Sequence, residues 1–450
     1  MQAAGVIIEL FRVWAESYMI FIITEFLQVT TSIFTEMSLF CHQFEVDFVQ
    51  TAGVIIEYNP MHMGHVHLLE EIRRLLGTDT AVICAMSGDF VQRGDFAVVG
   101  RRARAKAAVQ SGADLVLEIP LPWAVASAER FADGGVQVLL DAGLVSHIAF
   151  GSECGDADAL REIAECLLSD AFQEALRRGL TTGRPYAACR QKAVEQILGP
   201  EKAALLESPN NILGIEYCKS LLRRGSDVQP LTVPRVGAAH DEKDADGPIA
   251  SASAIRALLR AGERETALAR MAPAMRRAYE EEEAAGRAPV FQETCERAVL
   301  ARLRSMTEED FAALDEGREG LCNRLYDASR TAAGVAEILE KAKTKRYAYA
   351  RLRRMVLWAY LGLAPAAFPK EVPYLRVLAA NAMGRELLAR MRKTAAVPVL
   401  TKPADVRRLG AEARELFELE ARAADLYALA YPDLSAAVGG SVWREGPVIV

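Results

Sequence analysis

The 450-residue chain lacks the cysteine patterns that build metal or disulfide scaffolds. Its eight cysteines form no Cys-x-x-Cys pair, and no cluster of cysteine and histidine has zinc-site spacing. We expect incidental or buried thiols of a reducing, cytoplasmic environment. No uncharged run reaches the ~20 residues that a membrane span needs, and no basic segment typical of a signal peptide is present. We therefore expect neither a zinc protein nor a disulfide scaffold nor a membrane protein, and no metal ligand is predicted.

The net charge of the whole chain does not indicate a nucleic-acid-binding protein, because it is −7 at pH 7. The distribution of charge is different. Residues 341–408 hold sixteen Lys or Arg against three acidic residues. Such segregation is typical of a surface that binds a polyanion, and a helical surface of solvated arginines gives the same pattern. The length of 450 residues suggests two or three domains, and 51% hydrophobic residues suffice to form their cores.

The first fifty residues are atypical. The hexapeptide Ala4-Gly5-Val6-Ile7-Ile8-Glu9 recurs identically at 52–57, and only the second copy continues into a polar motif. The stretch between the copies is apolar and aromatic, and Thr24 and Glu25 interrupt it. We interpret residues 1–50 as an insertion or a misplaced start around a duplicated strand, dispensable and loosely attached. A helix at a membrane surface is the alternative.

The second copy leads into the segment Asn59-Pro60-Met61-His62-Met63-Gly64-His65. The short β-branched run at 53–58 predicts a buried strand, and apolar residues at helical spacing predict a helix that ends near residue 76. His62 and His65 therefore stand at a strand-to-helix turn, one helical turn apart. Free N–H groups at a helix start attract phosphate, and two imidazoles can both donate to phosphate oxygens. This arrangement favours chemistry at the α-phosphate of a nucleoside triphosphate; a metal site, a cap or a chance occurrence are the alternatives.

Residues 51–260 alternate between strand-like and helix-like blocks. Further strands are expected at 80–86, 114–119, 146–150 and 231–235, and helices at 101–111, 131–143 and from 208 onward. This alternation predicts an α/β fold, a Rossmann-like parallel sheet with helices on both faces. Polar residues follow three of the strands, at 59–65, 87–94 and 151–153. Because the carboxyl ends of parallel strands meet at one edge, we expect these segments to converge on one ligand site.

Beyond residue 258 strand patterns nearly vanish, and helical periodicity dominates to about residue 429. We therefore divide the chain into residues 1–50, an α/β domain at 51–260 and a mainly α-helical domain at 261–450. Ser251, Ser253 and Arg256 begin a helix, either as an N-cap or as a second phosphate-binding helix start. Tyrosines alternate with cations at 343–354, where Tyr347 either stacks on an unpaired base or belongs to the core.

Taken together, these segments resemble the bacterial tRNA-Met cytidine acetate ligase family, within the HxGH nucleotidyltransferase-like superfamily. The resemblance spans about residues 51–410 and rests on five segments. They are the histidine motif, Met86-Ser87-Gly88-Asp89-Phe90-Val91-Gln92-Arg93-Gly94, Phe150-Gly151-Ser152-Glu153, Pro209-Asn210-Asn211-Ile212-Leu213-Gly214 and Thr344-Lys345-Arg346-Tyr347. The whole superfamily shares the histidine motif, whereas the second and fourth segments are far more specific to the family.

The resemblance implies a ligase that converts ATP to AMP and pyrophosphate. Acetate attacks the α-phosphate of ATP, and the acetyl group of the acetyl-adenylate passes to N4 of the wobble cytidine of elongator tRNA-Met, giving N4-acetylcytidine. It implies ATP binding by residues 51–260, tRNA binding by 261–450 and Mg²⁺ on the phosphates. It also implies a cytoplasmic enzyme with no membrane and no evident protein partner. Catalysis falls to His62 and His65, which would stabilise charge at the α-phosphorus.

Carried over residue by residue, the ATP site is one continuous stretch and three separate positions: Ile55, Ile56, Glu57, Tyr58, Asn59, Pro60, Met61, His62, Met63, Gly64, His65, Val66, His67, Leu68, Gly151, Asn210 and Arg235. Gly151 would let adenosine pass close to the strand, Asn210 would bond the ribose or base, and Arg235 would serve the triphosphate or acetate. The resemblance places Gln92 and Arg93 at the acetate or cytidine pocket. The family's second phosphate motif is richer in Ser and Thr than this chain's, which leaves the roles of Ser253 and Arg256 open.

Two other functions stay open. One is an adenylyltransferase acting on a small phosphorylated metabolite, with a C-terminal half that serves only assembly. The basic, tyrosine-bearing region argues against it, because a small-molecule enzyme has no need of that region. The other is a non-catalytic RNA-binding protein with a relic nucleotide fold, and the presence of both histidines argues against that.

Overall fold

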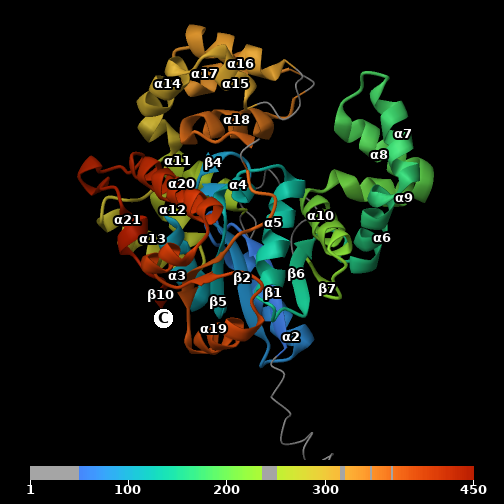
Figure 1. Cartoon of the computed structure of the whole chain (residues 1–450), viewed down its shortest axis with the longest axis horizontal. Helices are drawn as coiled ribbons and strands as arrows, with labels where there is room; N and C mark the ends of the chain where they lie inside the picture. The colour runs from blue at the N-terminus through green and yellow to red at the C-terminus, as the bar shows by residue number, and fades with distance from the viewer. Residues whose placement is uncertain (1–49, 236–250, 315–319, 345–346, 366–367) are drawn as a thin grey trace, which may run out of the picture. The chain divides into compact units, whose positions relative to one another are not determined.

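The structure is a computed structural model that describes residues 50–235, 251–314, 320–344, 347–365 and 368–450. Residues 50–450 form one unit. The predicted insertion and duplicated strand of residues 1–50 lie, apart from Gln50, outside the described residues. Figure 1 shows a central sheet with helices packed around it.

The sheet is mainly parallel. Its strands are β1 (Thr51–Ile56), β2 (Ala81–Ser87), β5 (Leu115–Ile119), β6 (His147–Ser152), β7 (Gln229–Pro234), β8 (Leu375–Ala380), β9 (Val399–Leu400) and β10 (Val448–Ile449); β3 (Phe90–Val91) and β4 (Asp95–Phe96) form a separate hairpin. The order is β10-β8-β5-β2-β1-β6-β7, and β9 also pairs with β8. The doubly wound part therefore has its switch point between β1 and β6, where such sheets bind ligands at their carboxyl ends.

All five strands predicted for residues 51–260 are present, and the predicted α/β fold is confirmed. Strand β1 is buried throughout, because both of its faces are covered. Ala52, Val54 and Ile56 share one core cluster with Leu69 of the following helix. Gly53 faces the other side, where an added Cβ would lie 2.7 Å from the Leu139 side chain. Helices on both faces explain why the strand is a continuous apolar run.

The helices of the body are α2 (Met63–Leu76), α3 (Arg101–Gln110), α4 (Leu121–Ala124), α5 (Ala128–Asp141), α6 (Ala157–Leu168), α7 (Asp170–Leu180), α8 (Tyr186–Leu198), α9 (Pro200–Ala204), α10 (Pro209–Arg223), α11 (Ala252–Arg260), α12 (Arg264–Ala269), α13 (Pro273–Ala284), α14 (Glu296–Ser305), α15 (Glu308–Ala312), α16 (Leu321–Thr331), α17 (Val335–Ala342), α18 (Tyr349–Leu361), α19 (Ala382–Thr394), α20 (Ala411–Ala428) and α21 (Ser441–Arg444). Short 3-10 helices are η1 (Leu205–Glu207), η2 (Gln292–Cys295), η4 (Pro403–Arg408) and η5 (Leu434–Ala436). None of the helices in the described ranges combines the length and the apolar character that crossing a bilayer demands.

The segment after residue 260 is mainly helical, as predicted, but it also contributes three strands to the sheet. Strand β8 lies antiparallel beside β5 and pairs Ala380 with Leu115. The sequence did not reveal β8, because its six residues are all buried and show no period-two alternation. Since the sheet draws strands from both sides of residue 260, the division of the chain at that residue stays a prediction.

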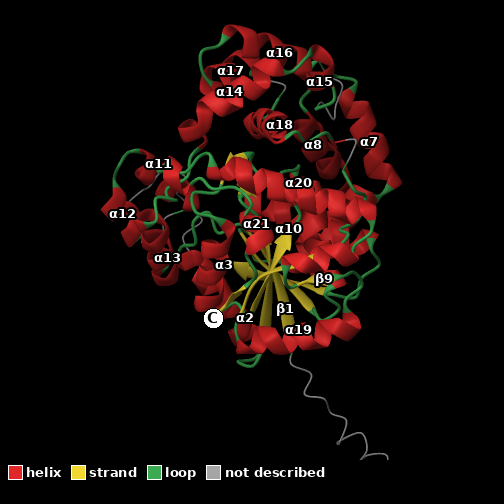
Figure 2. Ribbon diagram, turned by 60° about the vertical axis from the view of Figure 1, so that its left-hand side comes forward, coloured by secondary structure: helices red, strands yellow, loops and turns green. Residues whose placement is uncertain are grey.

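Two helical groups extend from the sheet (Figure 2). Helices α14–α18 enclose a second core that includes Phe311, Leu325 and Trp358. The Trp358 Nε1–H donates to the carbonyl of Val125 at 2.9 Å, which ties this bundle to the segment after β5. Helices α6–α10 form the other group, an insertion between β6 and β7. The first group therefore contacts the segment that follows β5, and the second group follows β6, and both strands end at the predicted ligand edge.

Candidate active site

The histidine motif forms the start of α2, as predicted. His62 is the N-cap, and its Nδ1 accepts a hydrogen bond from the Gly64 N–H at 3.1 Å. The Nδ1 of His65 in turn accepts from the His62 N–H at 3.2 Å. The two imidazoles thus cap the helix reciprocally, as serine and glutamate do in other helices. Because each Nδ1 is an acceptor, each neutral ring carries its proton on Nε2 and offers that N–H as a donor.

Both imidazoles are uncharged at neutral pH. Burial, with a smaller contribution from the positive charge of Arg235, lowers the pKa of His62 to about 4. Burial, the neighbouring His62 and Arg235 lower the pKa of His65 well below 6.5. The ring centroids lie 3.8 Å apart in a stacked arrangement. Two imidazolium rings at this distance would repel each other, so the geometry and the pKa shifts agree on two neutral donors side by side.

The loop before the histidines is held by hydrogen bonds to two other segments. Tyr58 adopts a left-handed backbone conformation with φ of 47°, and the Asn59–Pro60 peptide bond is cis. The Asn59 Oδ1 accepts from the Val98 N–H at 2.8 Å, and the Met61 carbonyl accepts from the Ala272 N–H at 3.0 Å. Non-glycine residues with positive φ persist where the surroundings over-determine them, and they cluster at functional sites.

Most apolar side chains of the predicted ATP stretch are buried in the core. Ile55 is buried, and Ile56, Tyr58 and Met61 lie in a core cluster, against which Val66 and Leu68 are packed. Met63 is 44% exposed. The polar side chains of this stretch are those of Glu57, Tyr58, Asn59 and the three histidines, and contacts of this stretch with a nucleotide stay a prediction.

Gly151 and Arg235 lie together at the carboxyl ends of β6 and β7. Gly151 is the penultimate residue of β6 and pairs with Val233 of β7, and the Arg235 N–H donates to the Ser152 carbonyl at 3.1 Å. A Cβ at Gly151 would lie 3.5 Å from the Arg235 Cγ, so the arginine stem covers the glycine. The influence of Arg235 on both histidine pKa values places its charge near the pair. The structure thus brings together residues from the ends of β1, β6 and β7.

Asn210 is brought to the same edge through Glu153, a residue to which the sequence had assigned no role. The Glu153 carboxylate accepts from the Asn210 Nδ2–H at 2.6 Å and from the Asn211 N–H at 2.9 Å. The Asn211 Oδ1 accepts from the Glu153 N–H at 3.0 Å. This reciprocal pairing fastens the loop after β6 to the start of α10. One N–H of the Asn210 amide is bound to Glu153, and the predicted contact of Asn210 with ribose or base stays a prediction.

Arg104 donates hydrogen bonds to three loops, a role that the sequence analysis did not predict. It is fully buried, its Nε–H donates to the Val99 carbonyl at 2.8 Å, and its guanidinium also donates to the carbonyls of Glu57 and Gly88. The only sequence signal is its place one turn after Arg101 in a helix rich in alanine. Arg104 therefore sets the spacing between the ends of β1 and β2.

The Glu57 carboxylate accepts from the Gln92 N–H at 2.6 Å, so the segment after β1 meets the family-specific loop at 87–94. Burial raises the pKa of Glu57, and the charges of Arg256, Arg104 and Arg93 oppose that shift. The Gln92 side chain donates to the Ala126 carbonyl at 3.0 Å. Arg93 is exposed. The structure thus brings Gln92 and Arg93 to the predicted edge, and their roles toward acetate or cytidine stay predictions.

The start of α11 serves as an N-cap. Ser251 accepts from the Ala254 N–H at 3.2 Å, the capping alternative of the sequence analysis. Arg256 donates to the Asn59 carbonyl at 2.6 Å and to the Ser253 hydroxyl at 3.2 Å. Arg256 therefore supports the loop that carries the histidines, across 197 residues of sequence. Its use as a phosphate ligand stays open, together with that of Ser253.

The basic residues of 341–408 are divided between two parts of the fold, and their binding of a polyanion stays a prediction. Arg353 of α18 pairs with Asp95 beside the β3–β4 hairpin at 2.6 Å. Helix α19 instead lies at the amino ends of the strands, since Asn381 contacts Asp114 before β5 and Thr394 contacts Ala142 before β6. Tyr347 is 5% exposed and belongs to the core. Consecutive helices put the cations on opposite edges of the sheet.

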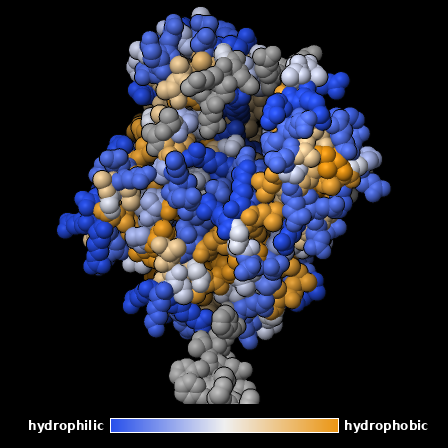
Figure 3. Space-filling model, turned by 45° about the vertical axis from the view of Figure 1, so that its right-hand side comes forward, coloured by the Kyte–Doolittle hydropathy of each residue, from blue (hydrophilic) through white to orange (hydrophobic). Residues whose placement is uncertain are grey.

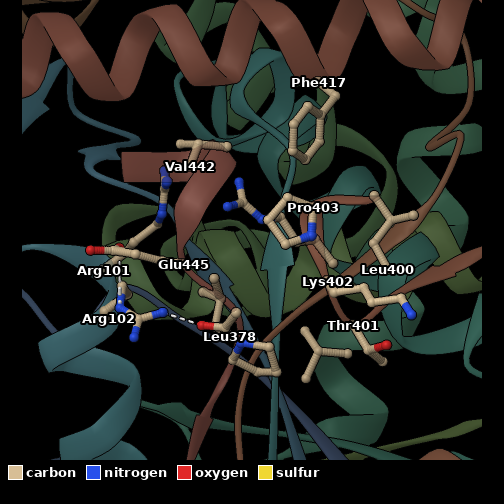
Figure 4. Close-up of a pocket in the computed structure, with 14 residues that line it drawn as sticks. Arg101, Arg102, Leu378, Leu400, Thr401, Lys402, Pro403, Phe417, Val442 and Glu445 are labelled. Carbon is tan, nitrogen blue, oxygen red and sulfur yellow. Dashed lines mark hydrogen bonds and ion pairs between the residues drawn. The ribbon is translucent and has the colours of Figure 1, made fainter. Parts of the chain in front are cut away.

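A cavity of about 20 Å³ lies at the outer edge of the sheet, where β9 and β10 pair with the two ends of β8 (Figure 4). Arg101, Arg376, Lys402 and Phe417 are among the residues that line it. A volume of this size holds about one water molecule, so no nucleotide fits in it. None of the residues that line it is a predicted ATP-site residue, so it is not the predicted ATP site.

The described residues contain no group of three or more His, Cys, Asp or Glu that would hold a metal ion by itself. A magnesium ion carried by a nucleotide needs few protein ligands, because it takes phosphate oxygens and waters. The donor set around the histidines, with two neutral N–H groups, a helix start and Arg235, suits the phosphates themselves.

The fold and the histidine pair define a nucleotidyltransferase. The sequence profile described as HIGH Nucleotidyl Transferase matches residues 49–439 of the chain. The tRNA(Met) cytidine acetate ligase of Acetivibrio thermocellus is 35% identical over 89% of this chain and 100% of its own length. That of Fervidobacterium nodosum is 34% identical over 86% and 96%.

Solved structures agree with these relatives. Thermotoga maritima TmcAL bound with alpha-thio ATP superposes with a TM-score of 0.82 at 30% identity, over 89% of this chain and 99% of that one. The apo form of the same protein gives a TM-score of 0.84 at 32% identity. The chain belongs to the tRNA(Met) cytidine acetate ligase family.

Proposed function

We propose that this chain activates acetate with ATP and transfers the acetyl group to N4 of the wobble cytidine of elongator tRNA-Met. The observation that carries the proposal is the reciprocal pair of neutral imidazoles, beside Arg235, at the switch point of the sheet. The relatives that match nearly the whole chain are named for this reaction, and a solved relative binds an ATP analogue. A cytoplasmic enzyme fits this function.

In the first step an acetate oxygen attacks the α-phosphorus of ATP, and the bond to pyrophosphate breaks. Negative charge grows on the phosphate oxygens as this happens. The Nε2–H groups of His62 and His65 can donate to those oxygens without giving up their protons, because both Nδ1 atoms are held by backbone N–H groups. Donors fixed before the reaction stabilise the transition state most effectively. The positive charge of Arg235 adds to this field.

In the second step the exocyclic amine of cytidine attacks the acetyl carbonyl, the carbon–oxygen bond to AMP breaks, and the amine loses a proton. This amine is a weak nucleophile because its lone pair is delocalised into the ring, so a free carboxylate would not react with it. Adenylation supplies the leaving group. When Mg²⁺ is bound to the phosphates, it neutralises part of their charge, and the chain need supply few ligands for it.

An adenylyltransferase of small phosphorylated metabolites would use the same histidine pair. It would have no need of the bundle of α14–α18, of which Arg353 and Arg354 pack against Gly94 of the family-specific loop. We therefore assign tRNA binding to residues of this bundle, within the predicted range 261–450. Exchange of pyrophosphate into ATP that requires acetate separates the ligase from this alternative.

The test is a histidine-to-asparagine series. The Asn Oδ1 can replace the Nδ1 of His65 as the acceptor for the His62 N–H, but the Nε2–H is lost. His65→Asn should fold normally and reduce acetate-dependent ATP–pyrophosphate exchange about 10²- to 10³-fold. His62→Asn should behave alike. The matched control is His147→Asn, whose Nδ1 is also hydrogen-bonded, to Ser146 at 3.0 Å, at the amino end of β6.

The control variant should retain full exchange. Nucleosides of tRNA incubated with the wild-type protein, ATP and labelled acetate should contain N4-acetylcytidine. Exchange within a few-fold of wild type in folded His65→Asn would overturn the assigned role of the imidazoles, and exchange that is independent of acetate would overturn the ligase.

A further inference from the structure

Helices α7 and α8 form a hairpin within the insertion that connects β6 to β7. The insertion that carries them leaves β6 directly after Gly151 and Ser152 and returns through α10. The hydrogen bond from Asn210 to Glu153 closes the base of this insertion. Figure 1 shows the hairpin and the α14–α18 bundle on the side of the sheet where β4 lies. Helix α7 has 11 residues, so its tip stands ~16 Å from its own start.

The tip of the hairpin is an ordered turn. The two helices approach closely at Gly179, where an added Cβ would lie 3.3 Å from the Cys189 Cβ. The Thr181 hydroxyl donates to the Arg178 carbonyl at 2.8 Å, and the Thr182 hydroxyl donates to the Gly179 carbonyl at 2.7 Å. The last carbonyls of α7 therefore have hydrogen-bond donors, and the side chains of the turn extend from a hydrogen-bonded backbone.

The charge of the hairpin is one-sided. Residues 175–194 hold five Lys or Arg and no acidic residue, in a chain whose net charge is −7. Three of these cations pair with acids outside the segment, on Glu174, Glu216 and Glu195. Within the part of the chain that the structure describes, Arg177 and Arg184 have no ion-pair partner and are exposed. Their charge is available to an anionic ligand.

An exposed aromatic ring accompanies these two arginines. Tyr186 is 57% exposed, and Leu180 beside the turn is 43% exposed. In Figure 3 the hairpin forms the lobe at the upper right, and its surface is mainly hydrophilic. Proteins that bind single-stranded nucleic acid combine exposed aromatic rings with cations. The cations bind phosphates, and a base stacks on the ring. A merely solvated helix surface needs no such tyrosine.

We infer that the tip of the α7–α8 hairpin is an RNA-binding surface separate from the α14–α18 bundle. Arg177 and Arg184 bind backbone phosphates of the tRNA, and Tyr186 stacks on an unpaired base. The inference rests on the proposed function, because it takes the tRNA as the partner whose wobble cytidine enters the site. It gives the tRNA contacts on both sides of that site, one from each helical group.

The test reverses the two free charges. In Arg177→Glu/Arg184→Glu, the Kd for tRNA should rise roughly tenfold or more at low salt, and the slope of log Kd against log salt should fall by roughly two, one for each phosphate that an arginine no longer neutralises. Acetate-dependent ATP–pyrophosphate exchange without tRNA should be unchanged. Tyr186→Ala should raise the KM for tRNA, and Tyr186→Phe should restore it, because phenylalanine keeps the ring.

The matched control is Arg392→Glu/Lys393→Glu on α19, which makes the same change in charge at the opposite edge of the sheet. It should leave the Kd for tRNA within about twofold of wild type. An equal rise of Kd in both double variants would show that only total charge matters and would overturn the inference, and so would an unchanged Kd in the hairpin variant. Wild-type protein without acetate-dependent exchange would instead refute the proposed function. If the double reversal does not fold, Arg177→Gln/Arg184→Gln tests the same two arginines.

Discussion

Gly94 is the residue at which the structure makes its sharpest energetic prediction. It ends the family-specific segment Ser87–Gly94 with a φ of +75°, in the turn between β3 and β4. A Cβ there would lie 2.5 Å from the Arg354 backbone nitrogen and 2.7 Å from the Arg353 carbonyl carbon. Both atoms belong to the backbone of α18, so no side chain can turn away to make room. Gly94→Ala must move a helix or the hairpin.

The cost has two parts. An alanine at positive φ costs about 1 kcal/mol relative to glycine. Relieving a contact of this kind against backbone costs about 1–3 kcal/mol more. Gly183 separates the two parts, because its φ is +74° and nothing lies within 4 Å of its added Cβ. Gly94→Ala should therefore lower the free energy of unfolding by about 2–4 kcal/mol, and Gly183→Ala by about 1 kcal/mol.

Urea denaturation with a common slope measures both variants. Gly94→Asn adds a further check, since asparagine tolerates the left-handed region and so removes most of the conformational cost while keeping the clash. It should still be much less stable than wild type. Equal destabilisation of the two alanine variants would refute the close approach of α18 to the loop, and with it the assignment of the bundle to the site edge.

Three further outcomes are expected. Burial and the neighbouring Glu118 raise the pKa of Glu420 to about 7, so its ionisation opposes folding as the pH rises above 4.5. Glu420→Gln should therefore stabilise the protein at pH 8 by on the order of 3 kcal/mol and change the thermal midpoint little at about pH 4. An equal shift at both pH values would contradict this. Because burial lowers the pKa of His62 to about 4, kcat/KM for ATP should stay constant as the pH is lowered through 6.5. The stability that the neutral ring contributes above pH 6.5 should be lost as the pH falls toward 4. A decrease of kcat/KM with an apparent pKa of 6.5 would mean that the ring is not buried as described. Arg104→Lys should lower the free energy of unfolding by about 2–4 kcal/mol, because an ammonium group cannot reach the carbonyls of three loops at once. A loss below about 0.5 kcal/mol would show that the hydrogen bonds of Arg104 to these loops are dispensable.

Much of the site was readable in the sequence, because its parts follow strands. The apolar runs of β1, β2 and β6 predict parallel strands, and the polar residues after them predict one common edge. The structure confirms that edge: Arg104 joins the ends of β1 and β2, and Arg235 covers Gly151 at the end of β6. Patterns of two and 3.6 residues are local, so they survive in a single sequence without any tertiary information.

Local sequence patterns could not predict the contacts between residues that are far apart in the chain. The hydrogen bond from Arg256 to the Asn59 carbonyl spans 197 residues, and no local period marks either partner. Strand β8 enters the sheet beside β5 from the far end of a helical segment. The basic residues of 341–408 are neighbours in sequence but lie at opposite edges, because successive helices leave the sheet in different directions.

The class of fold and the identity of the two histidines follow from the order of residues alone, since both depend on residue types within one strand–loop–helix unit. The protonation state of those histidines follows only from the folded arrangement. Burial makes both rings neutral, and the reciprocal caps direct their protons to Nε2. A proton's position depends on the surrounding dielectric and on the hydrogen-bond partners, and folding supplies both.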